Sequence, residues 1–273
     1  GPPILAGVNH ESVASAVPTV LRPYVTGLVG YRISGAYPGI HLGLPSPDLT
    51  LVIPLDDGVR LSGIGIGETP RLFEAVVAGL HPTAARIHHD GSQFGLQLSV
   101  TPLGARVLLR SPAAQFASGA VTLEQAMGAR GVALRERALA AGTWRARFAV
   151  VLSDVARSVA AEPEALRAPL QRAWDLLALS QGAIRIDDLA RDVGWSARHL
   201  TASFAAEFGP TPKLVARVHR FHRSRRLVGR VPLTDIAVRC GYADQSHLVR
   251  DWRQFAGTPP TRWLRDDAIA RVG

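Results

Sequence analysis

The 273-residue chain is poor in cysteine and in long apolar runs. Its one cysteine, Cys240, excludes an internal disulfide framework and suits a reducing compartment. No run of about 18 apolar residues occurs, so we expect no membrane-spanning helix. A charged segment followed by an apolar core, as in a secretory signal, is also missing. These absences lead us to expect a cytoplasmic protein.

Acidic residues are scarce in the second part of the chain. The net charge is +9, but residues 1–165 carry 13 Arg and Lys against 12 Asp and Glu, whereas residues 166–273 carry 18 against 10. A basic block of domain size is typical of a protein that binds a polyanion. A solvated basic surface is the alternative that charge alone leaves open.

The first part of the chain, to about residue 112, is predicted to be β-rich. Prolines are too frequent there for long helices. The segment LTLVIPL (49–55) is a short β-branched run between turn-forming segments, as expected of a strand. An Asp90-Gly91 pair between two strand-like segments predicts a β-hairpin.

From 113 to 160 the pattern becomes helical. Thr122 and Gln125 have the spacing of a capping box at the start of a helix. Apolar residues recur at helical spacing through the rest of this stretch. The segment AAEPEA (160–165) is the best candidate for a linker.

From residue 166 onward the sequence predicts helices separated by Gly and Pro, and part of it occurs twice. IDDLARDVGWS (186–196) matches LTDIAVRCGYA (233–243) at an offset of 47 residues. After one inserted residue the match continues, and each copy ends in Gly-x-x-Pro. The predicted helices cover about 164–181, 186–193, 196–208, 212–228, 233–240, 244–256 and 259–270. A duplication this long indicates two related structural units.

Each copy has the parts of a helix-turn-helix. Ala190 and Ala237 are small where two helices must approach, and Gly194 and Gly241 lie where a helix ends in a sharp turn. The second helix of each copy carries apolar residues every three or four positions, which defines a core face. The first turns of such a helix enter the major groove of DNA and contact bases.

Residues 166–268 resemble the DNA-binding domain of the AraC/XylS family of bacterial transcription regulators. The matching segments are LARDVGWSARHLTASFAAEFGPTP, the connecting RFHRSRRLV and DIAVRCGYADQSHLVRDWRQFAGTPPTRW. YPGIHLGLPSPDLTLVIPLDDG (37–58) is similar, more weakly, to the start of the N-terminal domain in such regulators. One departure is Ala202, which is small where many relatives place a larger polar side chain.

The resemblance implies an α+β multidomain protein. The N-terminal domain would span residues 1–160, with a β-rich, cupin-like half-barrel to about 112 and helices over 113–160, and would bind an effector or form an oligomer. Residues 161–166 would be the linker. Residues 167–273 would form an all-α domain of two helix-turn-helix subdomains joined by a linker helix.

The resemblance also implies a sequence-specific, DNA-binding transcription regulator, nucleoid-associated in the cytoplasm, under the control of a small-molecule effector. Its partners would be double-stranded DNA, in two adjacent major grooves per chain, RNA polymerase for an activator, and a second copy for a homodimer through the N-terminal domain. The alternative is a ligand-independent regulator controlled by a protein partner or by abundance. The effector, the operator and the sign of regulation are not encoded in the pattern.

The candidates for contact with DNA lie on and around the two recognition helices. Those for base contact are Arg198, Thr201, Ala202, Gln245, Ser246, Val249 and Arg250. Arginine can bind two acceptors of guanine and glutamine can bind adenine, but each arginine could instead contact only phosphate or water. Those for phosphate contact are Ser196, His199, Arg220, Arg223, Arg225, His247 and Arg253.

The spacing of the two recognition helices bears on the shape of the DNA. A linker helix over 212–228 would be about 25 Å long at about 1.5 Å per residue. Adjacent major grooves on straight DNA lie about 34–36 Å apart. Both helices would therefore bind together only if the DNA bends or if one contact is weak.

Motifs for catalysis and metal binding were sought and not found. SGIGIGETP (62–70) is glycine-rich but lacks the spacing and the Lys-Ser/Thr pair of a phosphate-binding loop. His88 and His89 are neighbours on a predicted strand and would point to opposite faces, so they do not form a metal site. A DNA-repair enzyme that transfers alkyl groups would need a reactive thiol, and Cys240 aligns with Val193 at a core position of the repeat. We expect no catalytic residue, no metal and no cofactor.

Overall fold

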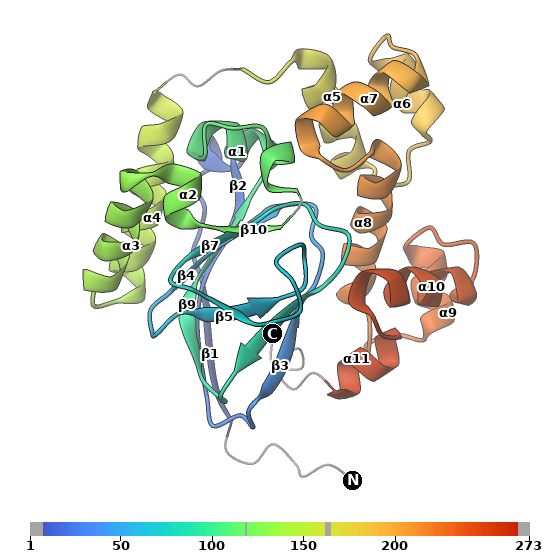
Figure 1. Ribbon diagram of the computed structural model, residues 1–273. Coiled ribbons are helices and arrows are strands. Elements are labelled where there is room, and N and C mark those ends of the chain that lie inside the picture. Colours follow the sequence, from blue (N-terminus) through green and yellow to red (C-terminus); the bar gives the residue numbers. More distant parts are fainter. Residues whose placement is uncertain (1–7, 118, 162–164, 267–273) are drawn as a thin grey trace.

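The computed structural model describes residues 8–117, 119–161 and 165–266 (Figure 1). Its β-rich part forms two antiparallel sheets, with the orders β1-β2-β9-β4-β7-β10 and β3-β8-β5-β6. The larger sheet contains β1 (Asn9–Ala14), β2 (Val25–Ser34), β4 (Leu49–Pro54), β7 (Val76–Ala78), β9 (Gln93–Val100) and β10 (Ala120–Thr122). The smaller sheet contains β3 (Gly39–Gly43), β5 (Val59–Ser62), β6 (Arg71–Phe73) and β8 (Ala85–His89). The predicted β-rich N-terminal region is thereby confirmed.

The two faces of the larger sheet differ because side chains alternate along each strand. In β4, the strand predicted at 49–55, Leu49, Leu51 and Ile53 are buried, while Thr50 and Val52 between them are only partly buried. The buried residues join a hydrophobic core with the helices that follow the sheet. One face of the larger sheet therefore packs on this core, and the opposite face is only partly buried.

The Asp90-Gly91 segment is a turn, but the predicted hairpin is wrong. Its flanking strands pair with different neighbours, because β8 belongs to the smaller sheet and β9 to the larger one. Gly91 has φ +110°, and a Cβ there would lie 2.1 Å from the carbonyl oxygen of Ala36. The Asp90 side chain accepts a hydrogen bond of 2.9 Å from the Ser92 amide. The dipeptide reverses the chain locally and passes it from one sheet to the other.

The expected boundary of the β-rich region at residue 112 needs correction on both sides. Helix α1 (Pro102–Leu108) begins before it, because Pro102 occupies the first helical position and Thr101 caps the Gly104 amide. Strand β10 lies after it and pairs with β7. The capping box of Thr122 and Gln125 is confirmed at the start of α2. The remaining elements of this part are η1 (Thr19–Leu21), η2 (Ala113–Phe116), α2 (Leu123–Met127), α3 (Ala129–Ala140) and α4 (Trp144–Ala160).

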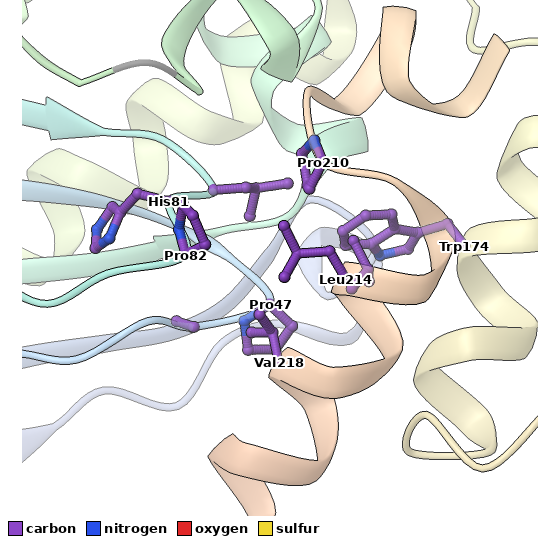
Figure 2. Close-up of a pocket in the computed structure, with 10 residues that line it drawn as sticks. Pro47, His81, Pro82, Trp174, Pro210, Leu214 and Val218 are labelled. Atoms are coloured by element: carbon purple, nitrogen blue, oxygen red, sulfur yellow. The ribbon is translucent and has the colours of Figure 1, made fainter. Parts of the chain in front are cut away.

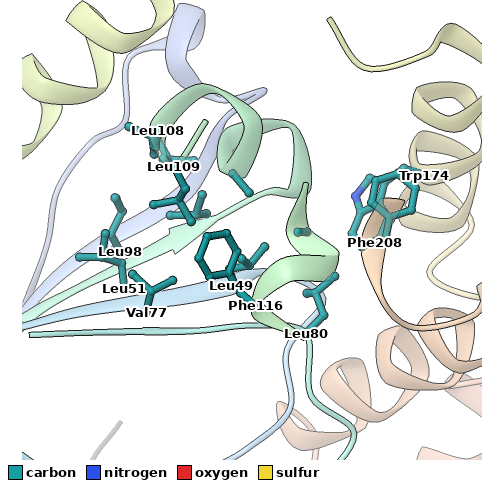
Figure 3. Packing of buried hydrophobic residues seen from close by; sticks show 14 of the residues in the cluster. Leu49, Leu51, Val77, Leu80, Leu98, Leu108, Leu109, Phe116, Trp174 and Phe208 are labelled. Atoms are coloured by element: carbon teal, nitrogen blue, oxygen red, sulfur yellow. The ribbon is translucent and has the colours of Figure 1, made fainter. Parts of the chain in front are cut away.

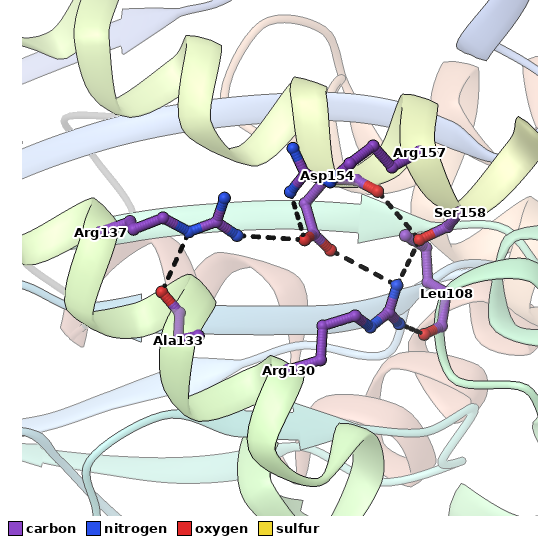
Figure 4. Close-up of polar contacts among 7 residues, drawn as sticks. All are labelled: Leu108, Arg130, Ala133, Arg137, Asp154, Arg157 and Ser158. Atoms are coloured by element: carbon purple, nitrogen blue, oxygen red, sulfur yellow. Dashed lines mark hydrogen bonds and ion pairs between the residues drawn. The ribbon is translucent and has the colours of Figure 1, made fainter.

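A buried carboxylate ties helices α3 and α4 together (Figure 4). Asp154 is 2% exposed and accepts hydrogen bonds from Arg137 at 3.2 Å and from Arg157 at 2.9 Å. Arg130 lies 3.6 Å from the same carboxylate and also donates to Ser158 and to the Leu108 carbonyl of α1. The three arginines thus compensate the buried charge and fix α1, α3 and α4 as one block.

The C-terminal part is all-helical, and the seven predicted helices are present. They are α5 (Ala168–Leu179), α6 (Ile186–Asp192), α7 (Ala197–Phe208), α8 (Pro212–Arg225), α9 (Leu233–Arg239), α10 (Gln245–Ala256) and α11 (Pro260–Asp266). Helix α8 ends at Arg225, which is earlier than predicted. Part of the predicted linker, 162–164, and the end of the last helix lie outside the described residues.

The hydrophobic core does not follow the predicted domain boundary. One cluster of buried side chains runs from the sheet through Leu80 and Phe116 to Trp174 of α5 and Phe208 of α7 (Figure 3). The second helix-turn-helix has its own cluster around Phe221 and Trp252. The first unit therefore shares its buried core with the sheets, whereas the second has a separate buried cluster that Leu42 of β3 and Leu44 only adjoin.

An ion pair reinforces the junction between the N-terminal part and the first helix-turn-helix. Arg106 of α1 donates two hydrogen bonds of 2.7 Å to the two carboxylate oxygens of Glu207 on α7. Their side chains are only 14% and 10% exposed. A bidentate pair of this kind has a fixed geometry. It holds the recognition helix α7 in one orientation relative to the sheets.

Removal of one partner of this pair should destabilise the protein strongly. Glu207→Ala removes both hydrogen bonds of this largely buried pair, and breaking a buried pair by removing one partner costs about 3–5 kcal/mol. Urea unfolding at neutral pH measures the loss. The matched control is Arg191→Ala, which breaks the exposed ion pair with Asp188 and should cost less than about 1 kcal/mol. Equal effects of the two substitutions would contradict the assignment.

Candidate nucleic-acid interface and ligand cavity

The two helix-turn-helix units, α6–α7 and α9–α10, have the same turn. Gly194 and Gly241 have φ of +73° and +74°, in the region that glycine adopts without strain. In both copies the next amide bonds back to the small buried residue of the first helix. Trp195 N donates to Ala190 O at 2.9 Å, and Tyr242 N donates to Ala237 O at 2.9 Å. The sequence repeat is therefore a repeat of the backbone.

The start of each recognition helix is capped as its sequence predicts. The Ser196 hydroxyl accepts from the His199 amide at 3.2 Å, and the Asp244 carboxylate accepts from the His247 amide at 2.7 Å. The histidine rings pack edge-on against the aromatic residue of the turn, His199 on Trp195 and His247 on Tyr242. Both histidines thus have a packing role, whatever their contact with DNA.

The candidates for base contact lie on the outward side of α7 and α10. The inward stripe is fully buried and consists of Leu200, Phe204 and Phe208 in α7 and Leu248, Trp252 and Phe255 in α10. Arg198, Ala202, Gln245, Ser246 and Arg250 are exposed, and Thr201 and Val249 are partly exposed. Both helices therefore offer the predicted side chains to a partner.

The candidates for phosphate contact fall into two groups. Arg223 and Arg253 are exposed and make no ion pair with any residue that the structure describes. Arg220, by contrast, donates to the Gly182 carbonyl at 2.8 Å and lies over the Tyr242 ring. Arg225 is partly buried and lines a cavity. Arg220 thus has a packing role and Arg225 lines the cavity, and the contact of either residue with phosphate stays a prediction.

The cavity has a volume of about 920 Å³ and lies between the two sheets on one side and the end of α8 with α11 on the other. Both sheets contribute residues from their facing sides, and α8, the turn after it and α11 form the remaining wall. The residues of this remaining wall are His222, Arg225, Arg226, Val228, Arg230, Trp263 and Leu264. Within the described part of the chain, α5, α6 and α7 contribute no lining residue.

Helix α8 connects every part of the site. It touches the first unit where His219 meets Trp174, and the second where Phe221 packs on Trp252. Trp252 also donates to the Ser224 hydroxyl at 2.9 Å. Figure 2 shows a narrow apolar seam in which Leu214 and Val218 face the loops of Pro47 and Pro82. The helix is thus held by both DNA-binding units and by the sheets.

The cationic residues of the cavity wall are the functional feature that the sequence prediction missed. Burial, followed by the charge of Arg226, lowers the pKa of Arg225. A signal for them exists in RFHRSRRLVGR (220–230), since five arginines on one short helix and its end cannot all face the DNA. Whether these arginines face the DNA or the cavity depends on where the sheets pack against α8, which the local sequence does not specify.

Other chemistries find no support in the described residues. No three His, Cys, Asp or Glu side chains among residues 8–117, 119–161 and 165–266 are arranged to hold a metal ion. In the same residues, no helix has the length and apolar character to cross a membrane. Burial raises the pKa of the Cys240 thiol, which is 3% exposed, so this thiol is a core residue rather than a nucleophile.

Known proteins share parts of the sequence pattern and the fold of this chain. A family model for a helix-turn-helix domain matches residues 189–266. No curated protein matches the chain. ToxT from Vibrio cholerae superposes with a TM-score of 0.53 at 13% identity, over 87% of this chain and 97% of ToxT. ToxT from Vibrio cholerae strain SCE256, in a form with a bound unsaturated fatty acid, gives a TM-score of 0.53 at 11% identity, over 93% and 98% of the two chains. At these identities the likeness shows the fold.

Two helix-turn-helix units on a shared helix define a DNA-binding domain. Residues 189–266 are a helix-turn-helix domain of the predicted type, and the chain as a whole shares the fold of ToxT. The predicted helix-turn-helix domain and the β-rich and all-helical architecture are confirmed.

Two histidines of α8 should make the protein less stable in acid. Burial lowers the pKa of His219 to about 4. Burial, together with Arg225 and Arg226, lowers the pKa of His222 to about 3. In the unfolded chain both rings titrate near about pH 6.5. As the pH falls below this value, the unfolded chain binds protons that the folded chain does not, so stability is lost.

Urea unfolding at about pH 7 and about pH 5 measures this loss. Each ring contributes at most about 1.4 kcal/mol per pH unit, and less here because both rings are partly exposed. The variant His219→Gln/His222→Gln should lose less stability between the two pH values than the wild type. Identical losses would show that other groups govern the acid sensitivity.

Proposed function

We propose that the protein binds two adjacent major grooves through α7 and α10 and that a small anionic effector in the cavity controls this binding. The observation that carries the proposal is the position of α8. The same helix joins the two recognition units and forms part of the cavity wall. A ligand in the cavity therefore contacts the element that sets the spacing of the two units.

The outward residues of the recognition helices support distinct roles in DNA binding. Arg198 and Arg250 are suited to guanine and Gln245 to adenine, through paired hydrogen bonds to base edges. Thr201 and Ser246 can contact base or phosphate, and Ala202 and Val249 can meet the thymine methyl group. The phosphate contacts fall to Ser196, His199, Arg223, His247 and Arg253, which lie on or beside these helices.

The length of α8 supports bent DNA. The helix has 14 residues, so it is roughly 21 Å long at about 1.5 Å per residue. Adjacent major grooves on straight DNA are about 34–36 Å apart. Bending of the DNA toward the protein would bring the grooves closer, at a cost of about 1–6 kcal/mol that further contacts offset.

Loss of Arg250 should weaken binding to specific DNA and relax the preference at one base pair. The duplex for the test is selected from random DNA with the wild-type protein. Arg250→Ala should raise the Kd by about 5- to 150-fold, as for the loss of a paired contact of about 1–3 kcal/mol. The matched control is Arg145→Ala, which removes an exposed charge on α4, far from α7 and α10 in the fold. Unchanged affinity and unchanged base preference for Arg250→Ala would remove the assignment.

The charge of the cavity wall supports an anionic ligand. Arg225, Arg226 and Arg230 line it, and none of them pairs with a carboxylate of the described residues. Asp56 is the one carboxylate among the lining residues. The volume of about 920 Å³ lies within the range of small-molecule sites, about 300–1,000 Å³. That ToxT of the same fold has been solved with an unsaturated fatty acid, a carboxylate, supports the same class of ligand here.

The asymmetry of the two units supports a route for control. The first unit shares its core with the sheets and is fixed by Arg106 and Glu207. The second unit has a separate buried cluster, and α11, whose Trp263 packs on Trp252 of that unit, lines the cavity. An effector would therefore shift the second unit relative to the first and so change the spacing of α7 and α10.

A thermal-shift screen of carboxylates and phosphate esters, including unsaturated fatty acids, tests the effector. A ligand at 100 times its Kd should stabilise the protein by about 2.7 kcal/mol. Arg225→Gln should weaken its binding about tenfold or more, because a hydrogen bond to a charged group is worth about 1.5–3 kcal/mol. The control Arg145→Gln should bind as the wild type does. If no anion stabilises the protein, a ligand-independent regulator controlled by a protein partner or by abundance is favoured.

A further inference from the structure

The chemistry of the cavity differs from wall to wall. The larger sheet presents hydrogen-bonding side chains, because the residues between the buried leucines of β4 and β9 face the cavity. Thr50 and Ser99 are directly opposite in register, and Gln97 follows on the same face opposite Val52. Neighbours of this kind lie about 5–8 Å apart. They form a compact polar patch, which we call the polar floor: Thr50, Gln97 and Ser99.

The polar floor has no partners within the protein. The side chains of Thr50, Gln97 and Ser99 make no hydrogen bond to any residue in the described ranges. Gln97 is exposed, and Thr50 and Ser99 are partly exposed, although all three line the cavity. Gly27 lies opposite Ser99 on the neighbouring strand, and even a Cβ at Gly27 would lie 3.9 Å from the Ser99 hydroxyl oxygen. The floor is thus open to a molecule in the cavity.

Another wall of the cavity is apolar. Leu61, Ile64, Val76 and Ile87 line it and belong to a separate hydrophobic cluster. The arginines of the α8 end, Arg225, Arg226 and Arg230, supply positive charge at the wall formed by the end of α8 with α11. A ligand that fits all three surfaces needs an acid group, several hydrogen-bonding groups and an apolar side.

A plain alkyl chain fits this arrangement poorly. It would displace water from Thr50, Gln97 and Ser99 and give no hydrogen bond in return, and an unsatisfied buried polar group is costly. Hydroxyl groups satisfy the same side chains, because each can both donate and accept. The C–H face of a ring can at the same time cover the apolar wall.

We propose that the effector is a hydroxylated ring acid, such as a sugar acid or a hydroxylated aromatic carboxylate. Its hydroxyl groups bond to Thr50, Gln97 and Ser99, its ring face covers Leu61 and Ile87, and its acid group faces the arginines of α8. This proposal rests on the proposed control by an anion in the cavity and adds the chemistry of the ligand body. It distinguishes this protein from a regulator that takes a simple fatty acid.

Isothermal titration of the full chain with matched probes tests the proposal. Dihydroxybenzoate is compared with benzoate, glucuronate with glucose, and oleate serves as the long-chain carboxylate. At least one hydroxylated anion should bind about tenfold or more tightly than its matched probe and than oleate, as expected for the gain of one or more hydrogen bonds. Oleate or benzoate binding as tightly as the hydroxylated anions would overturn the proposal.

Substitutions on the polar floor test the preference for hydroxyl groups separately from the binding of an anion in the cavity. Thr50→Val and Ser99→Ala keep the side-chain volume nearly unchanged, and circular dichroism checks the fold. They should abolish the preference for hydroxylated anions and leave benzoate binding unchanged, whereas Arg225→Gln should weaken all anions alike. A preference that survives on the altered floor would overturn the inference alone. Absence of binding by every anion in both series would overturn the anionic effector as well.

Discussion

The fixed length of α8 is the constraint on which the rest of this structure depends. A helix of 14 residues is a stiff rod, and its faces are divided among three neighbours. Leu214 and Val218 meet the sheets, His219 meets the first helix-turn-helix, and Phe221 with Ser224 holds Trp252 of the second. The spacing of the two recognition helices is therefore not free to vary unless α8 or its packing changes. The proposed coupling between DNA binding and occupancy of the cavity follows because both act on α8.

The two copies of the repeat have the same backbone but different surroundings. Their turns match down to the 2.9 Å hydrogen bonds of Trp195 and Tyr242. Yet the first copy is fused to the N-terminal core, while the second is seated against a cavity. Under the proposed function, this division makes the first unit the fixed reference and the second the unit that moves. A regulator with two identical attachments would respond to a ligand by moving both units, and their relative spacing would change little.

The sequence predicted the repeat, the turns and the caps, because these follow from local rules at single positions. Gly194 and Gly241 need a positive φ, and Ser196 and Asp244 need to cap the next helix, whatever the tertiary structure. The pairing of β8 and β9 was wrongly predicted because the Asp90-Gly91 turn specifies a reversal and not a partner strand. The cavity and the direction of Arg225 were not predictable, since both depend on how distant sheets pack on α8. The polar floor follows from alternation in β4 and β9 once the buried face is known.

The arginines that give the C-terminal part its excess positive charge fall into two groups, one exposed near the recognition helices and one lining the cavity. Arg198, Arg223, Arg250 and Arg253 are exposed and unpaired among the described residues, as a DNA interface requires. Arg225, Arg226 and Arg230 are equally unpaired but line the cavity, where their like charges repel one another. Burial, followed by the charge of Arg226, lowers the pKa of Arg225. The carboxyl end of α8 offsets part of this repulsion through its dipole. An anion that binds there removes the rest, and a ligand can shift an equilibrium only by its difference in affinity for the two states. Relief of this repulsion is a difference of that kind, and it acts at the end of α8 that carries the second recognition unit.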